Sequence, residues 1–592
     1  MTVIEERLRL ISFLKSNPTK VVASIKSIPV GEFSLVPIGE YILEDCETID
    51  LLAKWRNINV GVYPSRFEAT RDSTREWLSQ QLAHSSNRIL FLVSNPQGNI
   101  VGHMGLASID NSMHILEVDN VAKWSDSLPR NTFSDCLVAL LTWAKTTMYV
   151  EGFTLRVFST NSKAISFYKR NSFAESRSIP MMVDGSSSVD FVKLVECSNL
   201  DENNATEIML EMRYEEVSDL IPDSLILTAG PSISQYESFY AYDAACNGWN
   251  SSWSKYLDLL QTRFKDYIGV KHALATSSCT GAMHIALLAL GIGEGDEVIV
   301  PDQTWVATAN AVRYVQATPV FVDVNEDDWT INPLEIEKAI TNKTKAIMPV
   351  HMYGHPANMQ AVLEIASKHR VFVVEDAAPS IGAEFQGKKT GSFGHFSAFS
   401  FQGAKLMVTG EGGILLTNDD DLYEKAKKIW DQGRNSEIDL PFWIDEKGLK
   451  YKMANIQAAI GLGQLNRIET LVAMKRRIFS WYNKYLSGNS FIVLNQEPKD
   501  SRSIYWMSSI EVLRNSSVNR DQLIKALRKD NIDTRPVFPA ISQYPIWDND
   551  CLTPNPVAFH VGRNCMNLPS GVALSEAKIK YICERINYHT GF

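Results

Sequence analysis

Four short apolar runs in the second half of the chain alternate with stretches of helical periodicity, and this alternation constrains the fold most. The runs are VIVP, VFVDV, AIMPVH and VFVVED, at residues 298–301, 320–324, 346–351 and 371–376. Continuous apolar runs of this length are typical of strands buried on both faces, and strands separated by helices pair in parallel. The pattern therefore predicts an α/β region with a mostly parallel sheet.

A lysine lies between a strand-like run and a glycine-rich turn in SFQGAKLMVTGEGG, residues 400–413. FSAFSF before it and ILLT after it have strand character, which places Lys405 on the floor of the sheet. Placing a charged amine there is energetically unfavourable unless the amine takes part in a reaction. A Schiff base with pyridoxal phosphate (PLP) is one such chemistry. The alternative interpretation is a solvated loop lysine.

Three further features fit the same cofactor. Asp376 ends the run VFVVED at the edge where open α/β sheets bind ligands, and its carboxylate would keep the pyridine nitrogen protonated. The segment SSCTG, residues 277–281, precedes AMHIALLAL and supplies an amide-rich helix start for the phosphate. Trp305, just after a strand, is placed to stack on the ring. Taken singly, the three could be a turn residue, a helix cap and a core tryptophan.

Residues from about 226 to the end resemble the DegT/DnrJ/EryC1/StrS family of sugar-nucleotide aminotransferases, a fold-type-I PLP family. The matching stretches are ATSSCTGAMHIALLALGIGEGDEVIVPDQTWVATANAV, PVFVDV, PVHMYGHPANM, VVEDAAPSIGA, FSFQGAKLMVTGEGG, YKMANIQAAIGLGQL and DTRPVF. The resemblance implies that Lys405 forms the Schiff base, Asp376 pairs with the pyridine nitrogen and Trp305 stacks on the ring. It assigns the remaining contacts as follows: Ser400, Cys279 and Thr280 to the phosphate, and His351 and Arg535 to the substrate.

The chain departs from the family pattern at three positions. The family often has glycine at Cys279, and Pro379 occupies a position where other members have a side chain that can hydrogen-bond the cofactor. Lys450 stands where many members have an asparagine that reaches the neighbouring subunit's phosphate. The resemblance therefore implies a homodimer with shared PLP sites, in which Lys450 would contact phosphate as a point charge.

The stretch RVFSTNSKAISFYKRNSF, residues 156–173, reads as strand, polar turn and helix. Together with the strands around it, from about Phe33 to Tyr214, it resembles the GNAT family of acetyl-CoA-dependent N-acetyltransferases. The resemblance implies a mixed sheet with helices, Asn161 near coenzyme A, and Tyr168 donating a proton to the departing thiolate. Tyr168 could instead be a helix position that faces the sheet.

Two carboxylates, Glu117 and Asp119, end the strand HILEVD, and either could take a proton from an incoming amine or serve as a cap or ion pair. The family's pyrophosphate loop is usually basic and rich in glycine, whereas the corresponding segment here is KWSDSLPRNT. The amides at residues 131–132, with Arg130, could still bind an anion. The missing glycine weakens the prediction of coenzyme A binding.

The sequence predicts an N-terminal helical segment at 1–32, a GNAT-like domain at 33–216 and a connector at 217–225. The aminotransferase follows at 226–592, with a large domain to about 454 and a small α+β domain from about 455. The net charge of −10 argues against a nucleic-acid partner. Eight scattered cysteines without a CxxC pair indicate a reducing cytoplasm and no metal site, and no run is apolar and long enough to span a membrane.

These features predict a bifunctional enzyme. The C-terminal part would transfer an amino group from glutamate to a nucleotide-linked keto sugar, and the resemblance favours a 4-keto-6-deoxy sugar. The N-terminal part would acetylate the new amine with acetyl-CoA. Two alternatives stay open: the N-terminal part as a non-catalytic binding or assembly module, and the PLP part as a sensor or scaffold without turnover.

Overall fold

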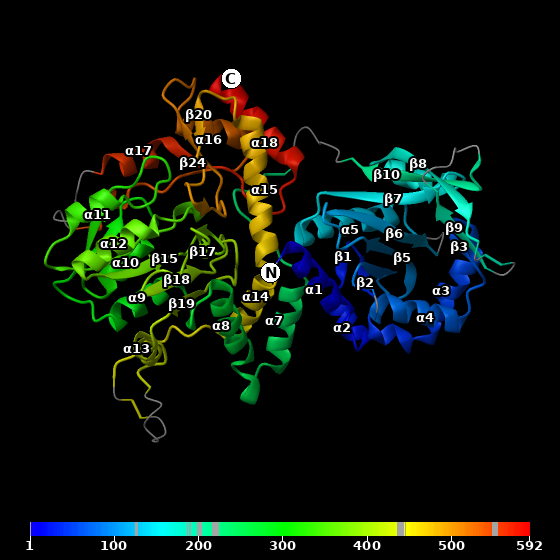
Figure 1. The fold of residues 1–592 in the computed structure, drawn as a ribbon, viewed down its shortest axis with the longest axis horizontal. Coiled ribbons are helices and arrows are strands. Elements are labelled where there is room, and N and C mark those ends of the chain that lie inside the picture. The colour runs from blue at the N-terminus through cyan, green and yellow to red at the C-terminus, as the bar shows by residue number, and fades with distance from the viewer. Residues whose placement is uncertain are drawn as a thin grey trace. The chain divides into compact units, whose positions relative to one another are not determined.

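The computed structural model describes residues 2–83, 85–124, 128–185, 187–188, 191–197, 204–215, 224–434, 443–444, 446–547 and 555–592. The chain divides into two compact units. One comprises Met1–Ser218 and Ser234–Phe239, and the other comprises Asp219–Ile233 and Tyr240–Phe592. In Figure 1 the first unit runs from blue to cyan and most of the second runs from green to red. The predicted connector, residues 217–225, lies mostly outside the described residues.

The first unit is built on a ten-stranded mixed sheet in the order β1-β2-β4-β5-β6-β7-β10-β8-β9-β3. Its strands are β1 (Ile28–Val30), β2 (Phe33–Pro37), β3 (Ser65–Arg66), β4 (Arg88–Ser94), β5 (Ile100–Ala107), β6 (Ile115–Lys123), β7 (Gly152–Phe158), β8 (Phe173–Val183), β9 (Val192–Glu196) and β10 (Glu207–Tyr214). Neighbouring strands are antiparallel except β6 and β7, which are parallel. The mixed sheet agrees with the prediction.

The longer helices of this unit are α1 (Val3–Lys15), α2 (Lys20–Ile25), α3 (Cys46–Ile58), α4 (Arg71–Ala83), α5 (Thr132–Met148) and α6 (Ser162–Arg170). Helix α1 is fixed by Arg7, which is only 1% exposed. The Arg7 guanidinium donates to the carbonyls of Met148, Ile109 and Tyr149 at 2.8–3.0 Å. Burial lowers the pKa of Arg7 to about 10. Helix α1 is therefore anchored to the rest of this unit.

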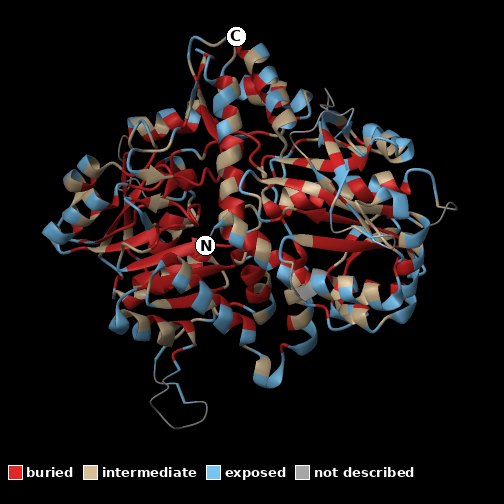
Figure 2. Ribbon diagram, turned by 45° about the vertical axis from the view of Figure 1, so that its right-hand side comes forward, coloured by how far each residue is buried: buried red, intermediate tan, exposed pale blue. Residues whose placement is uncertain are grey.

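The second unit contains a seven-stranded sheet in the order β11-β19-β18-β15-β14-β12-β13. Its strands are β11 (His272–Thr276), β12 (Glu297–Pro301), β13 (Thr318–Val322), β14 (Thr344–Ile347), β15 (Phe372–Asp376), β18 (Phe396–Ser400) and β19 (Gly413–Thr417). All pairs from β13 to β18 are parallel, and β19 is antiparallel to both of its neighbours. Figure 2 shows these strands as mostly buried, which explains their continuous apolar runs.

Helices connect and cover these strands: α8 (Lys255–Ile268), α9 (Cys279–Ala289), α10 (Ala307–Tyr314), α11 (Pro333–Ala339), α12 (Met359–His369) and α13 (Asp420–Trp430). Helix α7 (Gln235–Asn247) precedes them in the chain. Strand β14 ends at Ile347, earlier than the predicted run AIMPVH. Pro349 within that run has no N–H to donate to a sheet ladder, so the strand ends before it.

The C-terminal part combines helices with a four-stranded sheet in the order β20-β22-β24-β23. Its elements are α14 (Asn455–Leu465), α15 (Ile468–Leu486), β20 (Ile492–Leu494), β22 (Ser509–Val512), α16 (Arg520–Lys529), β23 (Arg535–Pro536), α17 (Pro556–Asn564), β24 (Cys565–Asn567) and α18 (Glu576–Thr590). A small sheet is formed by β17 (Lys388–Lys389), β16 (Glu384–Phe385) and β21 (Ser501–Arg502), and it joins the two parts of the unit. Ile226 is buried in the core formed with α15, α16 and α18.

Among the described residues no helix is long and apolar enough to cross a membrane. Over the same residues no group of three or more His, Cys, Asp or Glu side chains is arranged to hold a metal ion.

Candidate active site

Three strands of the second unit end at one edge of the seven-stranded sheet and bring predicted site residues together. Strand β15 ends at Asp376, its parallel neighbour β18 ends at Ser400, and β11 ends at Thr276, just before α9. Strand β19 starts at the same edge, where Gly413 pairs with Ser400. The carboxyl ends of the strands therefore form one floor, as the sequence predicted.

The start of α9 lies against this floor. A Cβ added at Gly413 would lie 2.5 Å from the backbone nitrogen of Cys279, so glycine is required for this close approach. The Ser278 Oγ caps α9 by accepting from the N–H of Gly281 at 3.0 Å. The N–H groups and positive end of the helix thus lie next to Ser400, where they suit a phosphate. Thr280 is in the same first turn.

Asp376 is buried at the end of β15 and is held by two donors. The Thr308 hydroxyl donates to its Oδ2 at 2.7 Å, and the N–H of Ala378 donates to its Oδ1 at 3.1 Å. These contacts fix the orientation of the carboxylate. A buried, oriented carboxylate at this position is suited to pair with a protonated ring nitrogen.

Lys405 lies close enough to Asp376 and Cys279 to interact with both electrostatically. Burial lowers the pKa of Lys405 to about 8, while the Asp376 carboxylate opposes the shift. Burial also raises the pKa of the Cys279 thiol, which therefore stays neutral. A lysine with this pKa has an appreciable neutral, nucleophilic fraction near pH 7–8.

Trp305 is 55% exposed, in the loop between β12 and α10, and its ring centroid lies 5.4 Å from that of Phe538. Its exposed surface is available to a ligand ring. Lys450 is exposed, and the carbonyl of its neighbour Tyr451 accepts from the N–H of Ser277 at 2.6 Å. Lys450 is therefore anchored through the chain to the segment that leads into α9.

The two predicted substrate residues differ in their surroundings. The His351 ring is 0% exposed; its Nδ1 accepts from the N–H of Ala357 at 3.0 Å, so its Nε2 carries the proton that is donated to Glu375 at 3.0 Å. The structure offers no exposed atom of His351 to a substrate, and its contact stays a prediction. The Arg535 side chain is well exposed on β23, 3.7 Å from Asp533, and is open to an anionic ligand.

In the first unit Asn161 caps α6, because its Oδ1 accepts from the N–H of Ala164 at 3.2 Å. Tyr168 lies on the same helix, between the rings of Phe167 and Phe173. Burial, aided by nearby Asp119, raises the pKa of the Tyr168 hydroxyl, so it stays protonated. Arg130 is exposed just before α5, and residues 125–127 of the predicted anion loop lie outside the described residues.

The two candidate bases of the first unit have different partners. Glu117 accepts two hydrogen bonds from Arg156, at 2.8 and 3.0 Å. Asp119 lies 3.0 Å from Arg88, and burial is the main cause that raises the pKa of its carboxyl. Both carboxylates are therefore ion-paired. The raised pKa of Asp119 suits a proton acceptor, and the role predicted for Glu117 stays a prediction.

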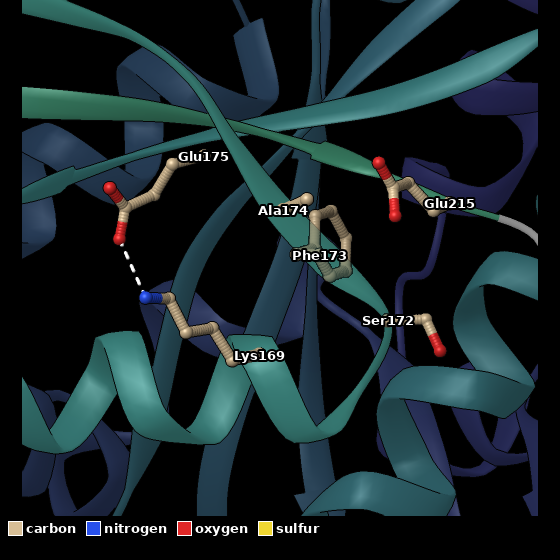
Figure 3. A pocket seen from close by; sticks show the side chains of 6 residues that line it. All are labelled: Lys169, Ser172, Phe173, Ala174, Glu175 and Glu215. Carbon is tan, nitrogen blue, oxygen red and sulfur yellow. Dashed lines mark ion pairs between the residues drawn. The ribbon is translucent and has the colours of Figure 1, made fainter.

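An open hollow of about 420 Å³ lies beside β8, where Lys169 and Glu175 form an ion pair of 2.7 Å (Figure 3). Ser172, Phe173, Ala174 and Glu215 complete its lining. The hollow contains none of the predicted site residues, and we assign no ligand to it.

Comparison with known proteins identifies the second unit. The model of the DegT/DnrJ/EryC1/StrS aminotransferase family matches residues 231–587. The chain belongs to this family. The matched region covers most of the second unit and includes every residue assigned above to the floor of the sheet. Strand β19 and helix α9, which form the phosphate corner, both lie within it.

Curated relatives agree with this membership. GDP-perosamine synthase of Escherichia coli O157:H7 is 41% identical over 357 residues, which are 60% of this chain and 96% of that protein. GDP-perosamine synthase of Caulobacter vibrioides is 40% identical over 356 residues, 60% of this chain and 95% of that protein.

Solved structures give the same result. A family aminotransferase from Brucella abortus has a TM-score of 0.56 at 29% identity and covers 60% of this chain and 96% of its own. A Streptococcus pneumoniae protein solved in its PLP form has a TM-score of 0.59 at 26% identity, with 62% of this chain and 99% of that chain covered. The family therefore uses PLP, and the donors found here fit it: an amine, a buried carboxylate and the N–H groups of a helix start.

Two residues at this site were not predicted from the sequence. Thr308 follows Trp305 by three residues, so the helical spacing after a strand edge could have pointed to it. Trp506 lies 101 positions beyond Lys405 in sequence, yet its ring lies under the Lys405 amine. No local sequence pattern signals that contact.

Proposed function

We propose that the chain is a bifunctional sugar-nucleotide enzyme. The second unit transfers an amino group, with glutamate as donor, to a nucleotide-linked 4-keto-6-deoxy sugar, and the first unit acetylates the resulting amine with acetyl-CoA. The observation that carries the first step is the convergence of Lys405, Asp376 and the start of α9 on one sheet edge, in a chain 40–41% identical to two GDP-perosamine synthases.

The residues of the second unit have separable roles. PLP, when bound, supplies an electron sink that stabilises negative charge on a carbon next to an amine. Asp376, Ser400, Cys279, Thr280 and Trp305 would hold it. Lys405 would bond to it covalently and, when released, take and return a proton at Nζ, a task for which a pKa of about 8 is suitable. Arg535 would bind a carboxylate or phosphate of a substrate as an exposed cation.

We also propose a homodimer in which Lys450 reaches the partner's cofactor phosphate. Lys450 is exposed, and the amine of Lys452, two residues further on, lies 5.5 Å from the ring centroid of Trp253, which is 54% exposed. Exposed apolar residues of this size are typical of contact surfaces. A second copy would cover them and bring an additional cation to the phosphate.

The proposal that the first unit binds acetyl-CoA is supported by the point at which the pairing of β6 and β7 ends. Their pairing in the described residues ends at Glu117 and Thr154, although β6 continues to Lys123 and β7 to Phe158. The facing edges beyond that point carry backbone N–H and C=O groups that the β6–β7 pairing does not use. The amide-bearing arm of coenzyme A supplies such groups in extended form, much as an added strand does. Tyr168 would then protonate the thiolate and Asp119 would accept the amine's proton.

Mass spectrometry of the product tests both steps. The full chain is incubated with a panel of nucleotide-linked 4-keto sugars, glutamate and acetyl-CoA. We expect an amino-sugar nucleotide without acetyl-CoA and its N-acetyl derivative with it. No amination of any 4-keto sugar would overturn the first step. Amination without acetylation would instead favour a non-catalytic binding or assembly role for the first unit. The segment at residues 123–132, which contains no glycine, would be consistent with that role.

A further inference from the structure

The ring of Trp506 lies directly under the amine of Lys405. The Nζ atom is 3.8 Å from the ring centroid, within the range of a cation–π contact. The indole N–H donates to the carbonyl of Ala404 at 2.8 Å, so the ring is attached to the backbone next to the lysine it faces. Trp506 belongs to the segment between β21 and β22, far from Lys405 in sequence.

Trp506 is itself held rigidly. It is 6% exposed, and the buried amine of Lys475 on α15 donates to its carbonyl at 2.7 Å. Its ring stacks on Tyr353, with centroids 5.8 Å apart and planes at 25°. A Cβ at Gly354 would lie 3.0 Å from the backbone nitrogen of Trp506, so the turn at residues 352–354 approaches this segment closely. The position of the indole is therefore fixed from three sides.

The rings continue from Trp506 to the predicted cofactor contact. Tyr353 also stacks on Phe538, at 5.6 Å and 26°, and Phe538 lies 5.4 Å from Trp305. A continuous series of aromatic side chains thus runs from the ring that would cover PLP to the ring beneath the catalytic amine. The packing fixes both ends of the site relative to each other.

We propose that Trp506 is a positioning residue that holds the protonated amine of Lys405 whenever this amine is not bonded to the cofactor. Lys405 is partly exposed, so its ammonium loses part of its hydration, and the negative face of an indole replaces part of what is lost without neutralising the charge. The four-carbon side chain would otherwise sample several rotamers, and the ring selects one of them. The inference rests on the proposed role of Lys405 and is independent of which sugar is the substrate.

Two other titratable groups, Asp376 and Cys279, face the amine, and the test leaves both residues unchanged. Asp376 favours the ammonium form of Lys405, and Cys279 does so to a smaller degree, whereas burial disfavours it. Trp506 carries no titratable group. A change at Trp506 therefore shifts the balance between these influences without adding or removing a formal charge.

The test measures the pKa of Lys405 in the full chain freed of its cofactor. Reductive methylation is followed at a series of pH values, and the Lys405 peptide is quantified by mass spectrometry. Trp506→Met removes the π face but keeps an apolar side chain, and we expect the Lys405 pKa to fall by about one unit. Trp506→Phe keeps a π face but loses the N–H, and we expect a pKa close to that of the parent. Trp481→Met, the same change at a tryptophan on α15, serves as the control.

The two variants also separate positioning from a purely structural role. If Trp506 only anchored the backbone at Ala404, the Phe variant would be as impaired as the Met variant. Equal Lys405 pKa values in the parent and the Met variant would overturn the proposal.

Should the Met variant fail to fold, fluorinated tryptophan incorporated at all 13 tryptophan positions keeps the ring shape and weakens its negative face. The Lys405 pKa should then fall in the same direction, and an unchanged pKa would overturn the proposal. Failure of the proposed function is distinguished in the parent protein. If PLP and borohydride label no adduct on Lys405, the assigned role of the lysine itself is wrong.

Discussion

The amine of Lys405 is subject to opposing influences. Burial lowers its pKa to about 8, and the Asp376 carboxylate favours the charged form. Lys405 is therefore partly protonated and partly neutral near pH 8. A residue that accepts and returns protons requires both states. Neither a fully exposed lysine nor one buried without a carboxylate would meet this condition.

Replacement of Lys405 by alanine should remove the covalent link to PLP and lower transamination on the order of a thousandfold or more. The measurement is amino-sugar formation, together with peptide mass spectrometry after borohydride treatment. Lys425→Ala, at an exposed position on α13, is the matched control and should behave as the parent does. Near-parent turnover by the Lys405 variant would show that another group performs this chemistry.

The positions of some site residues could be predicted from the sequence, and those of others could not. Asp376 and Ser400 follow apolar runs, and the rule that parallel strands end at one edge is enough to predict that they lie together. Trp506 and the partners of His351 depend on packing between distant segments. The carboxylate of Glu375 accepts from the His351 ring and also from the N–H groups of Gly391, Phe393 and Gly394. No local sequence pattern signals this network.

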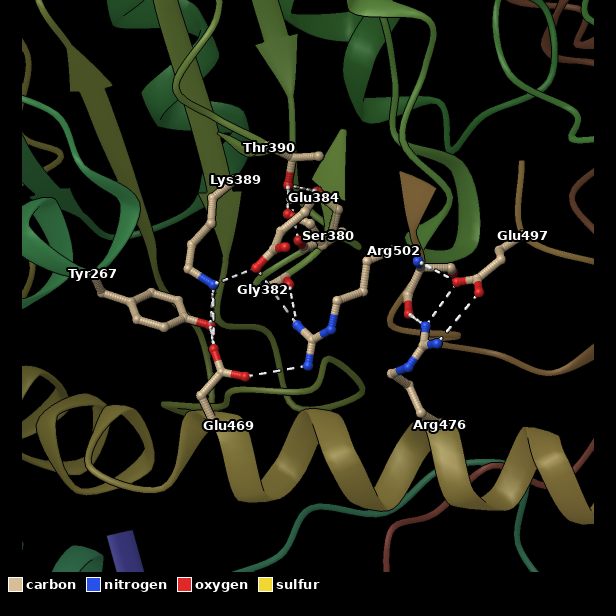
Figure 4. Close-up of polar contacts among 12 residues, drawn as sticks. Tyr267, Ser380, Gly382, Glu384, Lys389, Thr390, Glu469, Arg476, Glu497 and Arg502 are labelled. Atoms are coloured by element: carbon tan, nitrogen blue, oxygen red, sulfur yellow. Dashed lines mark hydrogen bonds and ion pairs between the residues drawn. The ribbon is translucent and has the colours of Figure 1, made fainter. Parts of the chain in front are cut away.

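At the level of elements, the start of α15 is joined to two strand segments by a group of ion pairs (Figure 4). Glu469 on α15 accepts from the Tyr267 hydroxyl at 2.8 Å and from Lys389 at 3.2 Å, and Arg502 lies 3.4 Å away. Its side chain is 15% exposed. Burial acts to raise the pKa of Glu469, but Lys389, Tyr267 and Arg502 together outweigh burial and leave the pKa below its ordinary value.

Glu469→Gln should destabilise the second unit by about 1–3 kcal/mol at pH 7, because two cations lose their shared partner. A carboxyl with a lowered folded-state pKa contributes stability above its unfolded pKa, near 4.5, and loses it as pH falls through the folded pKa. The parent and the variant should therefore converge in acid. Calorimetric unfolding from pH 7 down to about pH 2, below the folded pKa of Glu469, checks this.

Glu424→Gln removes an exposed pair with Lys427 on α13 and should cost little at any pH. A difference between the parent and the Glu469 variant that stays constant over this pH range would contradict the proposed ionic origin of the stabilisation.

The strands themselves were the easiest elements to predict. The runs at 298–301 and 371–376 lie within β12 and β15 or one residue from their bounds, since burial on both faces leaves a continuous apolar signature. The insertion of β10 between β7 and β8 was not predicted. Strand order depends on pairing over distance, and alternation within one strand carries no information about its neighbour.

For the whole molecule, the proposed order of reactions has a thermodynamic consequence. Transamination exchanges one carbonyl and amine pair for another and is close to thermoneutral, whereas acyl transfer from a thioester is downhill. Acetyl-CoA added to an amination at equilibrium should raise total consumption of the keto sugar. Tyr168→Phe should remove much of this effect and leave the initial amination rate unchanged, as product quantification by mass spectrometry would show.

Free coenzyme A in place of acetyl-CoA is the control, and it should leave the equilibrium where it was. Accumulation of free amino sugar that acetyl-CoA does not alter in the parent enzyme would contradict the two-step order.

The composition of the first unit determines where the chain tolerates division. Ser234–Phe239 belong to this unit although they follow the apparent connector. The side chain of Gln235 accepts from the indole of Trp143 at 2.7 Å, and Tyr236 stacks on Phe13 at 4.5 Å. A cut near residue 220 would separate Ser234–Phe239 from the unit in which they pack, and a cut after Phe239 would separate Asp219–Ile233 from the second unit. Exchange of either unit, in evolution or by an engineer, would therefore have to keep three chain crossings rather than a single joint.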